Sequence, residues 1–155
     1  MTPGVIAAQR AGIEHSLHEY THDPAADSYG LEAAEKLGVP PEQLFKTLVA
    51  KLDGKRLAVG IVPASRTLDL KAFAAALGAK RAAMAEVAEA ERATGYVAGG
   101  ISPLGQRKRL PMALDQSALG WDRIYVSAGR RGLDISLAPA DLLRLCNGVT
   151  AAIAR

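Results

Sequence analysis

The sequence has little of what several protein classes depend on. Its single cysteine, Cys146, excludes a disulfide scaffold, and the apolar helical pattern around it favours a buried small side chain over a reactive thiol. One cysteine also fits a reducing compartment. No run approaches the roughly 18 apolar residues of a membrane span, and the N-terminus lacks the regions of a signal peptide. We therefore expect a soluble, cytoplasmic protein without a membrane partner.

Sequence motifs of several enzyme classes are also absent. No G-x-S-x-G elbow frames a serine, although a Ser-His-Asp system is not excluded by composition. Residues 105–107 lack the GKS/T ending and the glycine spacing of a Walker phosphate loop. His15 and His18 fall on opposite faces of a strand, and neither they nor His22 have a carboxylate or cysteine at ligand spacing. We expect neither a metal ion nor a cofactor.

The net charge is small, but the basic residues are clustered. The formal charge is +3, from 19 Lys and Arg against 16 Asp and Glu, which argues only weakly for a polyanionic partner. Two basic runs follow glycine-containing segments, and they consist of Arg107, Lys108 and Arg109, and of Arg130 and Arg131. If the fold brings the runs together, they form a rim that suits a few phosphates; the alternative is solvated surface charge.

Apolar periodicity and turn residues predict a single domain, residues 1–155, in which helices and strands are mixed. The strongest local signal is Asp53-Gly54, which predicts a hairpin turn. Because the hairpin is antiparallel and βαβ alternation is irregular, we predict an α/β fold of the mixed α+β kind. Helices are expected at residues 3–12, 32–37, 70–77, 85–92 and 139–145, and strands at 15–20, 45–52, 56–62, 112–114, 124–127 and 133–137.

The segment from Thr94 to Pro111, TGYVAGGISPLGQRKRLP, is the most informative part of the chain. Gly99 and Gly100 leave the backbone free to take positive φ and to approach a bound group. Ser102-Pro103 is typical of an N-cap and first helical residue, whose free N–H groups favour an oxygen-rich or anionic ligand. The alternative is a tight turn between two elements, and the segment alone does not decide between them.

Three further polar residues stand out in the sequence. Lys46 lies in an apolar strand and shares a face with Leu48, which is unusual for a solvated ammonium; the alternative is a side chain that extends outward. Ser127 and Asp134 flank the turn SAGRRGLD, where the simpler explanation is an aspartate that stabilises its own turn.

Taken together, these segments resemble a known family. TPGVIAAQ, HEYTHDP, LFKTL, LDLK, LGAK, TGYVAGGISPLGQRKRLP and IYVSAGRRGLDI occur in the same order in the YbaK group of free-standing tRNA editing proteins. These are relatives of the editing insertion of bacterial prolyl-tRNA synthetase, and the likeness runs from Thr2 to the last residues. It implies a compact fold with a mixed, barrel-like sheet surrounded by helices.

The resemblance also implies a function. Such proteins remove cysteine wrongly attached to tRNA(Pro), working at its acceptor end in trans and in a transient complex with prolyl-tRNA synthetase. For the cysteine-specific group, the proposed nucleophile is the substrate's own thiol, so that the protein mainly positions the ester and stabilises the oxyanion. The alternatives are editing of another mischarged tRNA, such as Ala- or Ser-tRNA, and a non-catalytic aminoacyl-tRNA-binding module.

Carried over by motif, the resemblance assigns a role to individual residues. It implies that Lys46 is catalytic and that Ser102 positions backbone rather than acting as a nucleophile. The substrate-binding residues it implies are Tyr20, Gly99, Gly100, Ile101, Ser102, Ser127 and Asp134. The RNA-binding residues it implies are Arg107, Lys108, Arg109, Arg130 and Arg131. Ala128 stands where a second glycine is usual, and its methyl is expected to narrow the rim or restrict the backbone.

Overall fold

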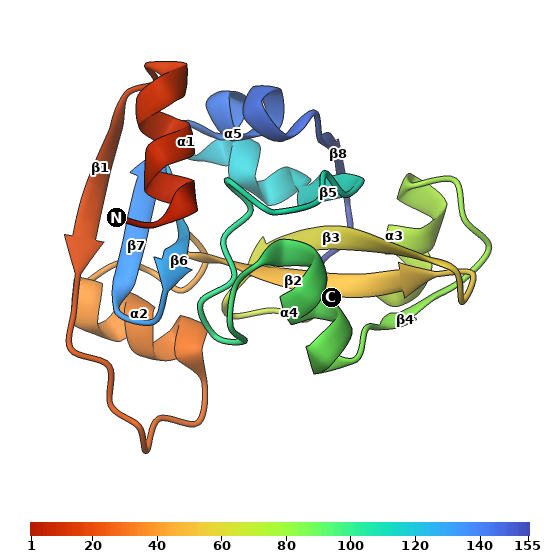
Figure 1. Ribbon diagram of the computed structural model, residues 1–155, viewed down its shortest axis with the longest axis horizontal. Coiled ribbons are helices and arrows are strands. Elements are labelled where there is room, and N and C mark those ends of the chain that lie inside the picture. Colours follow the sequence, from red (N-terminus) through yellow and green to blue (C-terminus); the bar gives the residue numbers. More distant parts are fainter.

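The computed structural model describes residues 1–155 and contains two β-sheets with five α-helices around them (Figure 1). The strands of the first sheet, in spatial order, are β1 (His15–Glu19), β7 (Leu133–Leu137) and β6 (Ile124–Arg130). Those of the second are β4 (Ala82–Met84), β2 (Phe45–Leu52), β3 (Arg56–Pro63), β5 (Met112–Asp115) and β8 (Val149–Ala151). The predicted mixed α/β fold is confirmed.

The helices are short and lie at the sides of the two sheets (Figure 1). They are α1 (Pro3–Ala11), α2 (Tyr29–Leu37), α3 (Leu70–Ala76), α4 (Val87–Thr94) and α5 (Pro139–Cys146), and a 3-10 helix spans Gln116–Gly120. None of them is long and apolar enough to cross a bilayer.

The two sheets are not closed into a barrel. One parallel bridge, between Leu44 and Tyr125, joins them, and the Tyr125 N–H donates to the Gln43 carbonyl at 3.1 Å. β2 pairs with β3 along its whole length and with β4 at Ala50–Leu52, so the residues just before β2 make the connection to β6. The barrel-like sheet expected from the resemblance is therefore replaced by two adjoining sheets with open edges.

The predicted hairpin is present between β2 and β3. Asp53 and Gly54 take φ of 52° and 67°, the positive values that a tight β-hairpin turn requires. The same sheet also contains parallel pairs, β3 with β5 and β5 with β8. β4 and β8, of three residues each, were not predicted, because runs this short carry no periodic signal.

Polar side-chain caps explain three of the five α-helix starts. The side chains of Thr2, Ser28 and Asp69 accept N–H groups at the starts of α1, α2 and α3. The cap at Ser28 starts α2 three residues before the predicted Glu32, and α4 begins two residues after its predicted start.

Of the two alternatives left open for Ser102-Pro103, the structure shows the turn and not the helix start. Residues 101–111 form turns and irregular structure. The Ser102 hydroxyl accepts the N–H of Leu104 at 3.1 Å, which closes a local turn, and Gly105 takes a φ of 67°, outside the helical region. Ser102 therefore stabilises a turn and presents no helix N-terminus.

The apolar interior consists of three clusters, one of which positions the site. The largest lies between the two sheets under α1 and α5, and a second lies under α3. The smallest contains Ala33, Ala34, Leu44 and Ala64, and it packs α2 against the residue that precedes β2. This contact holds α2 over the first residues of β2.

Candidate active site

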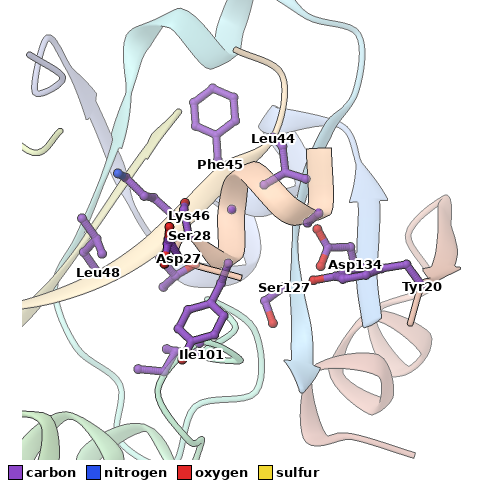
Figure 2. A pocket seen from close by; sticks show the side chains of 15 residues that line it. Tyr20, Asp27, Ser28, Leu44, Phe45, Lys46, Leu48, Ile101, Ser127 and Asp134 are labelled. Atoms are coloured by element: carbon purple, nitrogen blue, oxygen red, sulfur yellow. The ribbon is translucent and has the colours of Figure 1, made fainter. Parts of the chain in front are cut away.

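A cavity of about 290 Å³ opens where the two sheets meet. Its walls are α2 with the segment before it, the first residues of β2, the glycine-rich segment and the facing strands β6 and β7. Its apolar lining includes Leu44, Phe45, Leu48 and Ile101, and its polar lining includes Tyr20, Asp27, Ser28, Lys46, Thr47, Ser127 and Asp134. Figure 2 shows Lys46 on one side and Ser127, Asp134 and Tyr20 on the other.

Lys46 is the second residue of β2, at a part of the strand where β4 does not pair with it. The fully buried Phe45 anchors the strand beside it. The Lys46 ammonium is half-buried and belongs to no ion pair, and burial lowers its pKa. An uncompensated cation at a cavity wall is suited to an anionic or strongly polar ligand atom.

Asp134 is a buried carboxylic acid on β7. Ser127 lies opposite it on β6 and His18 on β1. Asp134 is only 5 % exposed, and burial raises its pKa to about 7. Burial also raises the pKa of Tyr20, and the charge of Asp134 adds to that shift. A carboxyl that titrates near neutral pH is suited to proton transfer.

Ser127 and Thr47 both line the cavity, but only the Ser127 hydroxyl has a hydrogen-bond partner within the protein. The Ser127 hydroxyl accepts the Gly129 N–H at 3.1 Å, so it already stabilises the turn after β6. The Thr47 hydroxyl oxygen is buried and has no hydrogen-bond partner within the protein. Because buried polar atoms are almost always paired, this hydroxyl is suited to a bound ligand or water.

The segment that leads into α2 is held by Glu32. The Glu32 carboxylate accepts from the Asp23 N–H at 2.7 Å and lies 2.7 Å from His22 Nδ1. Burial raises the pKa of Glu32, but the hydrogen bonds from His22 and Asp23 outweigh it and leave the pKa below its ordinary value. This network fixes the segment that carries Asp27 and Ser28 to the cavity wall.

The glycine-rich segment contributes only part of its length to the cavity. Gly99 and Ile101 line it, whereas Gly100 and Ser102 do not. Gly99 takes a φ of 88°, and Gly100 lies so close to the Arg130 backbone that an added Cβ would be 2.8 Å from its Cα. Ser102 is fully buried, beside Gly4 of α1.

Comparison with known proteins shows the family of the chain. The aminoacyl-tRNA editing domain profile matches residues 22–145. The chain belongs to the aminoacyl-tRNA editing domain family. It is 40% identical over 149 residues, 94% of this chain and 91% of the relative, to EbsC of Enterococcus faecalis, a protein named for deacylation of Cys-tRNA(Pro) and Cys-tRNA(Cys). This editing domain is accordingly a hydrolase of the aminoacyl-tRNA ester bond.

A second relative supports the assignment, and a solved structure shares the fold. The editing domain is 32% identical over 116 residues, 72% of this chain and 70% of the relative, to the multifunctional Ser/Thr-tRNA deacylase ProXp-y of Escherichia coli. Its fold matches a crystal structure described as a trans-editing enzyme for prolyl-tRNA synthetase, with a TM-score of 0.82, 24% identity and coverage of 100% of this chain and 99% of the other.

The two basic runs of the editing domain lie in different surroundings. The Arg131 guanidinium stacks 4.5 Å from the centre of the Tyr29 ring and donates to the Ala98 carbonyl at 2.6 Å, beside the cavity. Lys108 and Arg109 instead line a second cavity, and Arg109 donates to the Leu145 carbonyl. The two runs therefore do not form a shared rim around Lys46.

The alanine in the S-A-G turn of the editing domain does not narrow the cavity. Ala128 is fully buried in the largest apolar cluster and is not among the cavity-lining residues. Its φ is not positive, so the methyl causes no backbone strain. The expectation that this methyl alters the rim is wrong, because the side chain points into the core.

Sequence reasoning missed Thr47 and undervalued Asp134. Alternation along β2 drew attention to Lys46 and Leu48, and nothing in the sequence marks the Thr47 hydroxyl as unpaired. No general base stood out in the sequence, because the raised pKa of Asp134 depends on burial that only the folded structure shows.

Proposed function

We propose that this editing domain hydrolyses Cys-tRNA(Pro) in trans, beside prolyl-tRNA synthetase. The observation that carries the proposal is a mostly apolar cavity with an unpaired ammonium on one side and a carboxyl of near-neutral pKa on the other. The similarity to EbsC supports cysteine as the amino acid, and the fold shared with a synthetase trans-editing enzyme supports the partner.

The apolar part of the cavity suits a cysteine side chain. Leu48 and Ile101 offer no hydrogen-bonding side-chain groups, and a thiol needs few because it behaves as a small, weakly polar hydrophobe. The substrate ester lies between this apolar wall and Asp134. Gly99 lines the cavity, and because it carries no Cβ the Arg131 and Tyr29 side chains can pack directly against its backbone at this wall.

The substrate thiol supplies the nucleophile in this mechanism. Asp134 accepts the thiol proton, and the thiolate sulfur attacks the ester carbonyl carbon of the same cysteine. The new C–S bond forms, the C–O bond to the ribose breaks, and the ribose oxygen takes the proton from Asp134. The cyclic thiolactone that leaves the tRNA is then opened by water to give free cysteine.

Lys46 stabilises the negative charge that develops during attack. Its ammonium lies at the edge of the cavity without a carboxylate partner, so its field acts on the substrate rather than on a protein group. Burial lowers its pKa and thus brings protonated and neutral forms closer in free energy. The protonated form is the one that the mechanism uses.

A deacylation panel tests the proposal. Cys-, Ala-, Ser-, Thr- and Pro-tRNA(Pro) are incubated with the protein, with and without prolyl-tRNA synthetase, and loss of the aminoacyl group is followed. We expect Cys-tRNA(Pro) to be cleaved at least about tenfold faster than Ala- or Ser-tRNA(Pro), because only cysteine carries the nucleophile. Equal rates for Cys- and Ala-tRNA(Pro) would contradict the thiol mechanism and point to an activated water.

Deacylation of Ser-tRNA is a second candidate function. The buried Thr47 hydroxyl, which has no partner, provides a hydrogen-bonding group for a serine hydroxyl, and ProXp-y is a relative named for Ser/Thr-tRNA. Thr47→Val separates the candidates, because it keeps the shape and removes the hydroxyl. A selective loss of Ser-tRNA cleavage in this variant supports deacylation of Ser-tRNA. An unchanged ratio of the Cys-tRNA and Ser-tRNA cleavage rates supports deacylation of Cys-tRNA(Pro).

A further inference from the structure

We propose that the tip of the β2–β3 hairpin is a second tRNA contact, which binds backbone phosphates of the acceptor arm. The contact consists of Lys55, Lys80 and Arg81, called here the hairpin-tip patch. These side chains line a shallow surface hollow together with Asp53 and no apolar residue. The inference rests on the proposed function, because it names the surface that holds the rest of the same tRNA.

The fold brings the patch together from two separate parts of the chain. Lys55 belongs to the hairpin turn, whereas Lys80 and Arg81 precede β4. One Asp53 carboxylate oxygen accepts the backbone N–H groups of Lys80 and Arg81, each at 3.0 Å, and the Asp53 N–H donates to the Arg81 carbonyl. The only acidic side chain in the hollow is therefore engaged in fixing the backbone that carries two of the cations.

The cations of the patch outnumber its one carboxylate, that of Asp53, by three to one. Lys55, Lys80 and Arg81 are exposed, and none of them forms an ion pair. Some other basic residues of the protein do have acidic partners: Arg123 pairs with Glu14, Arg130 with Glu19, Arg144 with Asp141, and Lys51 with Glu89. Three free cations around one hollow are typical of a site for phosphate oxygens.

β2 connects the patch directly to the active-site cavity. The strand carries Lys46 near its first residue and ends at Leu52, just before the hairpin turn, and Figure 1 shows it running away from α2 toward the tip. Six residues of extended chain span about 20 Å. The unpaired 3′ end of a tRNA bridges a gap of this size, so a 3′ ester beside Lys46 places the first stem phosphates near the patch.

The first measurement is binding of uncharged tRNA(Pro) at several salt concentrations. Lys80→Ala/Arg81→Ala is compared with the matched control Arg10→Ala/Arg144→Ala, which removes the same charge from α1 and α5. We expect the patch variant to bind more weakly and to lower the slope of log affinity against log salt by about two, because two phosphate contacts are lost. The control should keep the wild-type slope.

The second measurement uses a minimal substrate, a cysteinylated CCA trinucleotide, which lacks the stem. We expect Lys80→Ala/Arg81→Ala to raise KM for full-length Cys-tRNA(Pro) several-fold, while kcat and cleavage of the trinucleotide stay at wild-type values. Failure of the proposed function is seen separately, as absence of Cys-tRNA(Pro) cleavage by the wild-type protein, and it leaves the tRNA-binding measurement intact.

Three outcomes overturn the inference. One is a patch variant with wild-type affinity and salt slope for tRNA. Another is a lower tRNA affinity and a lower salt slope in Arg107→Ala/Lys108→Ala alone, which would place the acceptor stem at the basic run of residues 107–109. The third is unchanged tRNA binding together with loss of synthetase-dependent cleavage, which would make the patch a protein contact. Thermal unfolding of each variant checks that the fold is retained.

Discussion

The two sides of the glycine-rich segment differ in whether the neighbouring polar side chains have partners within the protein. On the cavity side, beside Gly99 and Ile101, the Lys46 ammonium lacks an ion-pair partner and the Thr47 hydroxyl lacks a hydrogen bond. On the other side, under α1, the Tyr96 hydroxyl donates to the Leu104 carbonyl at 2.6 Å.

The packed side is complete without a ligand. The Ser102 hydroxyl accepts the Leu104 N–H, and the Thr94 hydroxyl donates to the Ala90 carbonyl at 2.8 Å. Burial raises the pKa of Tyr96 to about 12, so this hydroxyl stays a neutral hydrogen-bond donor. The comparison teaches that the buried hydroxyl without a partner lies on the cavity side, whereas the turn beside it satisfies its own polar groups and is built for stability.

The largest expected effect is at Lys46. Lys46→Ala should lower kcat/KM for Cys-tRNA(Pro) by about a thousandfold, because it removes the positive charge from the cavity wall. The unfolding midpoint should stay near the wild-type value, since no protein group depends on this ammonium. Lys51→Ala, on the same strand but paired with Glu89, is the matched control and should keep its activity. Near wild-type turnover of Lys46→Ala would remove Lys46 from the mechanism.

Asp134 gives the sharpest test, because function and stability should move in opposite directions. The pKa of its carboxyl rises from 3.8 in the unfolded chain to about 7 in the folded protein, so the folded state binds more protons between these values. Burial of this carboxyl therefore costs little free energy of unfolding at low pH, where it is protonated. The cost grows as pH rises and reaches about 4 kcal/mol above neutral pH. Asp134→Asn should remove this cost.

Denaturant unfolding at about pH 4 and about pH 8 measures that change. Asp134→Asn should gain stability over the wild type at the higher pH while its deacylation rate falls about a hundredfold and loses the rise through neutral pH. Tyr96→Phe is the counterpart on the packed side and should lose about 1 kcal/mol of stability with unchanged kcat. A stability loss in Asp134→Asn at the higher pH would contradict the comparison.

The smallest expected effects on activity come from one glycine substitution on each side. A Cβ at Gly105 would lie 2.5 Å from the Pro3 carbonyl oxygen, and a Cβ at Gly99 would lie 2.6 Å from the Arg131 side chain. Backbone cannot move aside as a side-chain end can, so Gly105→Ala should cost about 3 kcal/mol of unfolding free energy and Gly99→Ala less. Gly99→Ala should lower kcat/KM by more than Gly105→Ala does. Equal losses of kcat/KM in the two variants would contradict the difference between the cavity side and the packed side.

Much of the fold could be predicted because its signals are local. Asp53-Gly54 specifies the β2–β3 turn through its positive φ angles, and Thr2 and Asp69 specify helix starts through their side-chain caps. Ser102-Pro103, where the sequence left a helix start and a turn both open, shows the limit of this reasoning. The serine does accept an N–H group, but that of Leu104 in a turn, and a cap-like residue pair cannot tell a turn from a helix.

The sequence by itself determined the helices and all strands except β4 and β8, the family, and the position of Lys46 on an apolar strand face, since these depend on residues close together in the chain. Only the tertiary structure decided which glycines face the cavity, which hydroxyl has no partner, and which cations share a surface. It also decided the proton affinity of Asp134. Each of these depends on burial and on contacts between distant segments, and neither has a local signature in the sequence.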